Sequence, residues 1–259
     1  MNRWAITREV SSSIGECELT HVARAPIDVD KARAQHARYA ECLARLGCDV
    51  IRLPEEPGMP DSLFVEDTAI VLDELAIITR PGAMSRRGES EAVETALRPF
   101  RETARIDPPA TIDGGDVLVI GRRIFVGRSA RTNDHAIEQV RQLVEPLGYR
   151  VRAVDVSGCL HLKSAAAGVS EGVILVNDVW IDPSVFEPLE TIPIDPGEPH
   201  AANALRIGEV LIYPSTFPRT AERLEKRGIR LELVDLSELA KAEGAVTCCS
   251  LIFSDDLMP

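Results

Sequence analysis

Five short two-stranded segments recur along the 259-residue chain at nearly even spacing. Each has two apolar strands around a polar or glycine-containing turn, which is typical of a β-hairpin. The segments are EDTAIVLDELAIIT, GDVLVIGRRIFVG, KSAAAGVSEGVILVN, NALRIGEVLIYP, and a fifth that pairs TCCSLIF near the C-terminus with WAITRE near the N-terminus. The marker residues Asp67, Asp116, Ser164, Asn203 and Cys249 stand 49, 48, 39 and 46 residues apart. Such a period indicates a repeat array or a propeller.

Amphipathic helical stretches lie between the hairpins, and they exclude a propeller with all-β blades. The clearest stretch, residues 28–47, begins with acidic residues and ends at a glycine, as a capped helix does. Others cover residues 89–100, 133–148, 220–228 and 236–244. We therefore predict a five-bladed α/β propeller with pseudo-fivefold ββαβ-type repeats, closed by the N- and C-terminal strands. Because no Pro-, Gly- or Ser-rich linker divides the chain, residues 1–259 are predicted to form a single domain.

The net charge of −12 and the pI near 5.0 disfavour a nucleic-acid partner, which needs clustered Lys and Arg. This field suits a small cationic substrate better. The N-terminal residues lack an apolar signal region, and no stretch reaches the roughly 18 apolar residues of a membrane span. The protein is therefore expected in the cytoplasm, away from membranes. The six cysteines show neither a disulfide framework nor a zinc-ribbon spacing.

Two adjacent cysteines in AVTCCSLIF are candidates for a reactive thiol. If this segment is a β-strand, alternation places Cys249 on an apolar face with Leu251 and Phe253, and Cys248 on the other face with Ser250. Cys249 is then a core residue, and Cys248 is the candidate nucleophile.

A thiol nucleophile needs a nearby histidine that a carboxylate orients. Of the five histidines, His36 and His135 fall in helical stretches, where a solvated face is expected. His161 begins a predicted strand three residues before the Ser164 marker, and Asp113 stands three residues before the Asp116 marker. Equivalent positions in a pseudo-symmetric ring converge on its axis, so both side chains could meet Cys248 there. His200 also stands three residues before its marker, so position alone leaves both histidines open.

Charged residues at the hairpin entrances and exits could bind a substrate with two charged ends. Three carboxylates precede or begin the first hairpin and could form a cation pocket: Asp61, Glu66 and Asp67. Three arginines follow the first two hairpins and could bind a carboxylate through their planar guanidinium groups: Arg86, Arg87 and Arg131. This combination fits arginine or one of its derivatives.

The segments FVEDTA, ITRPGAMSRRGE, DGGDVL, GRSARTN, LHLKS and TCCSL resemble, in this order, the signature segments of the dimethylargininase (dimethylarginine dimethylaminohydrolase) family. The likeness extends over nearly the entire chain. The family belongs to the guanidino-group-modifying superfamily, whose fold is a five-bladed α/β propeller.

The resemblance implies a role for each candidate residue. Cys248 matches the nucleophile, His161 the general acid and base, and Asp113 the carboxylate that orients the histidine. The other matches concern substrate binding. Glu66 and Asp67 match contacts to the guanidinium, Arg86 and Arg131 a clamp for the α-carboxylate, Asp61 a residue at the amino-acid end, Ile14 a position in a mobile lid loop, and Ala242 a backbone carbonyl near the substituted nitrogens.

The implied reaction is hydrolysis of Nω-methylated arginine to citrulline and a methylamine through an S-alkylthiouronium intermediate. It needs no metal or organic cofactor, and a homodimer is one open oligomeric state. Cys249 beside Cys248 leaves open a zinc-inhibited pair with His161. Two rival functions remain: arginine deiminase or amidinotransferase within the superfamily, and a non-catalytic propeller that binds a partner. Asp113, where arginine deiminases carry Glu, and the short chain favour dimethylargininase.

Overall fold

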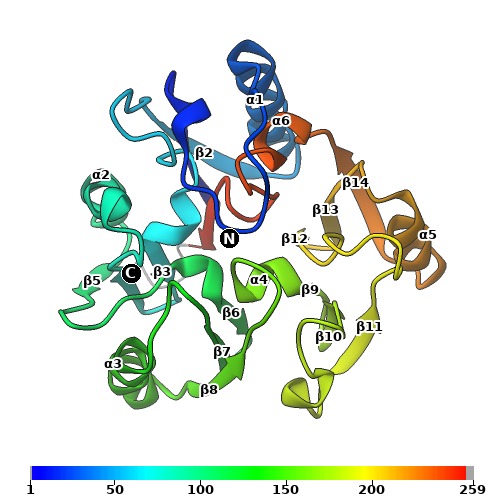
Figure 1. Ribbon diagram of the computed structural model, residues 1–259. Helices are drawn as coiled ribbons and strands as arrows, with labels where there is room; N and C mark the ends of the chain where they lie inside the picture. Colours follow the sequence, from blue (N-terminus) through cyan, green and yellow to red (C-terminus); the bar gives the residue numbers. More distant parts are fainter. Residues whose placement is uncertain (1, 255–259) are drawn as a thin grey trace.

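The computed structural model describes residues 2–254 and contains five three-stranded sheets around a central axis (Figure 1). Each sheet contains an antiparallel pair, which is a hairpin in all but the sheet that joins the chain ends, and a third strand that runs parallel to the middle one. The predicted five-bladed α/β propeller is thus confirmed, although residues 1 and 255–259 of the predicted domain lie outside the described residues. The sheets consist of β3 (Ala69–Val71), β4 (Leu75–Ile78) and β5 (Glu102–Arg105); β6 (Val117–Ile120), β7 (Arg123–Arg128) and β8 (Arg150–Asp155); β9 (Ala166–Ser170), β10 (Val173–Val176) and β11 (Glu190–Pro193); β12 (Leu205–Ile207), β13 (Val210–Pro214) and β14 (Arg230–Val234); and β15 (Leu251–Ser254), β1 (Arg3–Arg8) and β2 (Cys48–Leu53).

The fifth sheet closes the ring by joining the two ends of the described chain. Strand β15 pairs antiparallel with β1, with Arg3 opposite Ser254 and Ile6 opposite Leu251. Strand β1 pairs in parallel with β2 over its whole length. A strand from near each end of the chain thus belongs to the same sheet, and the predicted closure of the ring by the terminal strands is confirmed.

The longer helices lie on the outside of the ring, each between the second and third strand of a unit (Figure 1). A parallel pairing requires such a crossover. These helices are α1 (Val29–Arg45), α2 (Ser90–Leu97), α3 (Asp134–Val144) and α5 (Pro218–Lys226). In the unit of β9 to β11 the crossover contains only a 3-10 turn, Pro183–Phe186. Two short helices, α4 (Leu162–Ala165) and α6 (Ser237–Ala240), precede or follow the strands, and none of the described helices is long and apolar enough to span a membrane.

Helix α1 shows how local sequence sets these elements. The Asp28 side chain accepts a hydrogen bond from the N–H of Lys31 at 3.0 Å, which caps the first turn. Past the last turn, Gly47 adopts φ +87°, a conformation that side chains disfavour. The prediction of a solvated face for His36 is wrong, since this side chain is only 3% exposed. It lies one helical turn from the buried Tyr39, on the apolar face.

The TCCSLIF segment differs from the single strand predicted for it. Strand β15 begins only at Leu251, where pairing with β1 begins, and the two cysteines lie in the preceding turn. The N–H of Ser250 donates to the carbonyl of Thr247 at 3.4 Å and closes this turn. The strand-alternation argument that separated Cys248 from Cys249 is therefore wrong, although Cys249 is a core residue as predicted, with 0% exposure.

His161 does not begin a strand either. It precedes α4, and the N–H of Ser164 donates to its carbonyl at 3.0 Å. The N–H of Leu162 donates to the buried carboxylate of Asp116 at 2.9 Å. Because this carboxylate holds the first residue of α4, the backbone turns just before β9 and directs His161 inward.

Candidate active site

A cavity of about 20 Å³ lies between loops from several units of the ring. Seven of the ten predicted site residues line it: Asp61, Asp67, Arg86, Arg131, His161, Ala242 and Cys248. Four further residues complete the lining: Glu18, Phe64, Leu160 and Glu243. The convergence of residues from position 18 to position 248 follows from the ring, because each unit directs its entrance loop toward the same axis.

His161 and Asp113 form a buried pair. The Nε2 atom of His161 lies 3.0 Å from Oδ2 of Asp113, and the two side chains are 6% and 0% exposed. The other oxygen of Asp113 accepts the N–H of Gly82 at 2.8 Å. The second ring nitrogen, Nδ1, lies 3.9 Å from Oδ1 of Asp67. The imidazole is thus held between two carboxylates, as a general acid and base requires.

The surroundings of His161 favour its protonated form. Burial alone would lower its pKa, but the charges of Asp67, Asp113 and Asp116 outweigh this effect and raise the pKa to about 9. At neutral pH the imidazole therefore carries a proton that it can transfer to a leaving group.

The Cys248 thiol has the opposite environment. The residue is partly exposed, but its thiol is desolvated, and the negative charges of Glu66 and Asp67 add to this effect, so its pKa is raised well above the ordinary value. Cys248 lines the cavity, whereas the Sγ atom of Cys249 contacts the carbonyl of Ala245 within the core. The cavity thus combines a neutral thiol with a charged imidazole.

Asp67 is the central carboxylate of the cavity. Its Oδ2 atom lies 2.5 Å from Nη1 of Arg86, and its Oδ1 atom accepts the N–H of Gly115 at 3.0 Å. Burial would raise its pKa, but Arg86 and His161 lower it overall. Asp67 therefore stays ionised, and it can bind a cationic group placed in the cavity.

Arg86 contacts protein carboxylates on several sides. Its guanidinium also lies 2.8 Å from Glu89 and donates to the carbonyls of Asp61 and Phe64. The side chain is only 5% exposed. The neighbouring Arg87 instead donates to the carbonyl of Pro81. Arg86 therefore orders the site residues around it, and a substrate carboxylate would compete with these partners.

Arg131 is more accessible. Its Nη1 lies 3.8 Å from Asp113, and its Nη2 donates to Oγ1 of Thr20 at 3.2 Å. Nearby, the buried Asp61 accepts the N–H of Glu18 at 3.0 Å. Arg131 and Asp61 thus offer a cation and an anion to the two ends of an amino acid.

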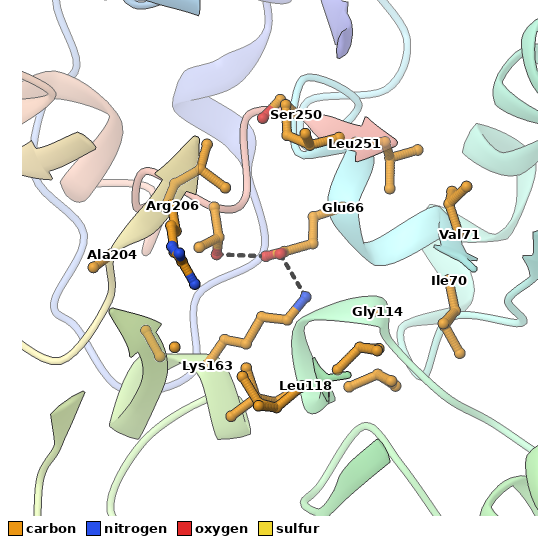
Figure 2. A pocket seen from close by; sticks show the side chains of 18 of the residues that line it. Glu66, Ile70, Val71, Gly114, Leu118, Lys163, Ala204, Arg206, Ser250 and Leu251 are labelled. Carbon is orange, nitrogen blue, oxygen red and sulfur yellow. Dashed lines mark hydrogen bonds and ion pairs between the residues drawn. The ribbon is translucent and has the colours of Figure 1, made fainter. Parts of the chain in front are cut away.

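Glu66 points away from this cavity. Its carboxylate lies 2.6 Å from Nζ of Lys163 and accepts the hydroxyl of Thr247 at 2.7 Å, as the dashed lines in Figure 2 show. These side chains line a separate cavity of about 410 Å³. The N–H of Glu66 donates to the carbonyl of Cys248 at 3.3 Å. Glu66 therefore influences Cys248 in two ways: its charge raises the pKa of the thiol, and its N–H binds the Cys248 carbonyl.

Ile14 is also placed elsewhere. It is fully buried in an apolar cluster that includes Tyr39 and Leu63, and it does not line the cavity. Glu18, four residues later in the same N-terminal segment, lines the cavity. Ala242 does line the cavity, next to Glu243.

Gly115 permits the close packing of the charged groups. A Cβ atom on Gly115 would lie 2.6 Å from Nδ1 of His161 and 2.8 Å from Oδ1 of Asp67. On the preceding Gly114 it would lie 2.0 Å from the carbonyl oxygen of Glu66. The double glycine in DGGDVL was therefore a signal that the sequence interpretation missed, because only glycine admits such approaches. Glu18, Phe64, Leu160 and Glu243 carried no comparable signal.

The ligating atoms of Asp67, Asp113 and His161 all lie within 4.8 Å of one another, which is close enough to consider a metal ion. Their hydrogen bonds account for the arrangement without one. A metal would have to displace the proton that the high pKa holds on His161, and Asp67 already neutralises Arg86. Cys249 does not line this cavity, and within the described residues no group of possible metal ligands joins it to Cys248 and His161.

Comparison with known proteins agrees with this geometry. The sequence profile for eukaryotic N,N-dimethylarginine dimethylhydrolase matches residues 20–184. The N(G),N(G)-dimethylarginine dimethylaminohydrolase of Streptomyces coelicolor is 40% identical over 249 residues, which are 95% of either chain. Its Pseudomonas aeruginosa counterpart is 36% identical over 228 residues, covering 87% of this chain and 90% of the relative.

Solved structures give the same result. A cysteine-to-serine variant of the Pseudomonas aeruginosa protein, complexed with citrulline, superposes with a TM-score of 0.92 and 35% identity over 98% of this chain and 100% of the other. The N-terminal domain of ArgZ, an arginine dihydrolase of cyanobacteria, shares the fold, with a TM-score of 0.88 at 17% identity over 100% of both chains. The identity, the coverage and the site together show that this chain belongs to the dimethylarginine dimethylaminohydrolase family.

Proposed function

We propose that this protein hydrolyses Nω-methylated arginine to citrulline and a methylamine, with Cys248 as the nucleophile. The observation that carries the proposal is the buried pair of Asp113 and His161, whose imidazole is protonated at neutral pH beside the Cys248 thiol. The close relatives bear the name of this activity, and a related structure contains citrulline.

Substrate binding would activate the thiol. The guanidinium of the substrate would lie beside Asp67, which Arg86 holds in place, while Arg131 would face its α-carboxylate and Asp61 its α-amine. A cation near Cys248 offsets the negative charges that keep the thiol protonated, so its pKa falls and the proton is released. Cys248 is therefore a full nucleophile only when a cationic substrate is present.

The reaction then takes two steps. The Cys248 thiolate forms an S–C bond with the guanidinium carbon, and His161 gives its proton to the departing methylamine as the C–N bond breaks. The neutral His161 next accepts a proton from water, which attacks the thiouronium carbon. The C–S bond breaks, citrulline leaves and the thiolate returns. Asp113 orients His161 throughout and stabilises its charged form.

Three finer assignments belong to the same proposal. The chain acts as one catalytic domain over residues 1–259, in the cytoplasm and as a homodimer. The six free thiols among the described residues suit a reducing compartment. Sedimentation equilibrium of the purified protein tests the homodimer, and a monomer at all concentrations would contradict it.

A citrulline assay with arginine, monomethylarginine and asymmetric dimethylarginine tests the activity. We expect citrulline and a methylamine from the methylated substrates, and loss of both products in Cys248→Ser. Release of ammonia from arginine at a higher kcat/KM than that for either methylated substrate would instead indicate a deiminase.

A further inference from the structure

The N-terminal loop over residues 17–28 is held in place by several side chains, of which Glu243 binds the most backbone N–H groups. Asp61, Arg131 and Lys241 each make one further hydrogen bond to the loop. The carboxylate of Glu243 accepts hydrogen bonds from three consecutive backbone N–H groups, those of Thr20, His21 and Val22. Successive N–H groups that point at one anion form a strong binding site, because each bond is charge-assisted. This arrangement joins two segments that are more than 200 residues apart in the sequence.

The backbone of Glu243 is unusual as well. Within residues 2–254, Glu243 is the only non-glycine residue with positive φ, at +58°. This left-handed conformation is costly for a residue with a side chain, so surrounding contacts must hold it in place. The hydrogen bonds to the loop supply such contacts. Ala242, the preceding residue, lines the cavity, so the same turn sets a wall of the site.

The loop closes the site. Glu18 lines the cavity; its N–H donates to the Asp61 carboxylate, and its own carboxylate accepts the hydroxyl of Ser85. The enclosed volume is about 20 Å³, close to the space that one water molecule needs, and far too small for an arginine derivative. Such a substrate can enter only if lining residues move, and a movement of the loop that carries Glu18 would break or rearrange the bonds to Glu243.

We propose that Glu243 is the latch of this loop: its carboxylate sets the closed position over residues 20–22 and thereby positions the substrate for the reaction. Glu243 is a positioning residue in this scheme, since it acts through the loop rather than on the reacting atoms. The assignment of a substrate pocket rests on the proposed function, whereas the latch itself concerns only the protein and is measurable without substrate.

The first experiment compares Glu243→Gln, Glu243→Ala and Glu243→Gly with the parent protein by hydrogen exchange. The three N–H groups donate to one oxygen of Glu243. The neutral amide oxygen of Gln should bind them more weakly than the carboxylate, and Ala and Gly offer no acceptor, so exchange at residues 20–22 should become faster in all three variants and about tenfold faster or more in the Ala and Gly variants. Trypsin should also cut faster after Arg24, whose side chain donates to the carbonyls of Gly15 and Cys17 within the loop. Unchanged exchange and cleavage would overturn the latch.

The Gly variant guards against a simple folding defect. Glycine accepts the left-handed conformation without strain, so Glu243→Gly should unfold at a temperature at least as high as Glu243→Ala while it loses the latch equally. Glu209→Gln is the matched control, because Glu209 is 93% exposed and its nearest cationic partner, Arg206, lies 3.5 Å away on the same turn. This control should leave exchange at residues 20–22 as it is in the parent.

Kinetics separate a positioning role from a chemical one. Because the latch holds the closed loop over the substrate, Glu243→Gln should raise KM about fivefold or more and change kcat less than about threefold. A large fall in kcat at unchanged KM would refute the positioning role. If no methylated arginine is a substrate at all, the proposed function fails, while the exchange and proteolysis results still decide whether the latch exists.

Discussion

The Nε2 atom of His161 lies 3.0 Å from Oδ2 of Asp113, and both side chains are almost completely buried. Two residues that are 48 positions apart thus form one proton-transfer unit. The spacing equals one repeat of the ring, so the contact joins equivalent entrance loops of neighbouring units. The carboxylate fixes the orientation of the imidazole and contributes to the pKa of about 9.

Replacing Asp113 with Asn should change the pH dependence as well as the rate. Burial lowers the pKa of His161, and the neighbouring carboxylates raise it. Removing the carboxylate of Asp113 should therefore lower this pKa. Activity needs the protonated form of His161. In the parent protein, kcat/KM should therefore fall above about pH 9, where His161 loses this proton. In Asp113→Asn this alkaline limb should move to lower pH, and kcat should fall about 100-fold or more. An unshifted limb in the pH profile would exclude this role.

Gly115→Ala should damage catalysis without unfolding the ring. The added Cβ would meet Nδ1 of His161 at 2.6 Å and Oδ1 of Asp67 at 2.8 Å, and both are side-chain atoms that can shift. A shift of the imidazole by a fraction of an ångström would lower kcat, by about 100-fold. Gly114→Ala provides the contrast, since its Cβ would meet the backbone of Glu66 at 2.0 Å and should also lower the unfolding temperature. Measured kcat and thermal unfolding distinguish the two.

The adjacent cysteines should behave differently. Cys248→Ser should lower citrulline formation about 1000-fold or more, because a serine hydroxyl is a far weaker nucleophile than a thiolate. Cys249→Ala should keep most of the activity and lose about 1 kcal/mol of stability, as a small cavity in the core does. Alkylation of Cys248, mapped by mass spectrometry, should be slow in the free protein at neutral pH and should become faster as the pH rises, because desolvation and the charges of Glu66 and Asp67 keep the thiol protonated. Equal loss of activity in both variants would contradict the assignment.

Replacing the two arginines of the cavity, Arg86 and Arg131, should have different effects on stability and on KM. Arg86→Ala leaves the buried carboxylates of Asp67 and Glu89 without their cation, which costs about 3–5 kcal/mol and lowers Tm by roughly 10 °C. Arg131→Ala removes one long ion pair of 3.8 Å and one hydrogen bond to Thr20, but Asp113 keeps its bond to His161, so Tm should fall less than in Arg86→Ala. It should instead raise KM, by about tenfold, since one charged contact to the substrate is lost. A large KM effect in a stable Arg86→Ala protein would reverse these roles.

The repeat pattern made the fold predictable. Each hairpin has apolar strands and its own turn signal; one example is Gly121, which adopts φ +56°. Five such local patterns at even spacing predicted the ring. The same repeat placed Asp113 and His161 at equivalent positions, from which their contact could be expected. His200 was equally eligible by position, but its ring packs 5.2 Å from that of Trp180 in the structure. Position in the repeat therefore does not separate the two histidines; the family resemblance and the three-dimensional arrangement do.

Side-chain directions were not predictable in the same way. Glu66 and Asp67 are neighbours in a 3-10 turn, yet one faces Lys163 and the other faces His161. The partners lie about 100 residues away, so no local pattern encodes the choice. The position of Ile14 in the core also depends on long-range packing. Local signals thus placed the elements, whereas competition between distant charged and apolar groups decided which side chains reach the cavity.

The buried His36 predicts an acid-sensitive fold. Burial, with the nearby charge of Arg52, lowers its pKa to about 4, below the ordinary 6.5. The folded state therefore holds His36 neutral while the unfolded chain takes up a proton, so stability is intact above about pH 6.5 and is lost as the pH falls toward 4. The full effect is at most about 3 kcal/mol. In His36→Asn, urea unfolding between pH 7 and 4.5 should show a smaller decline than in the parent protein, because this titration is absent; parallel curves for the two proteins would show that His36 contributes nothing.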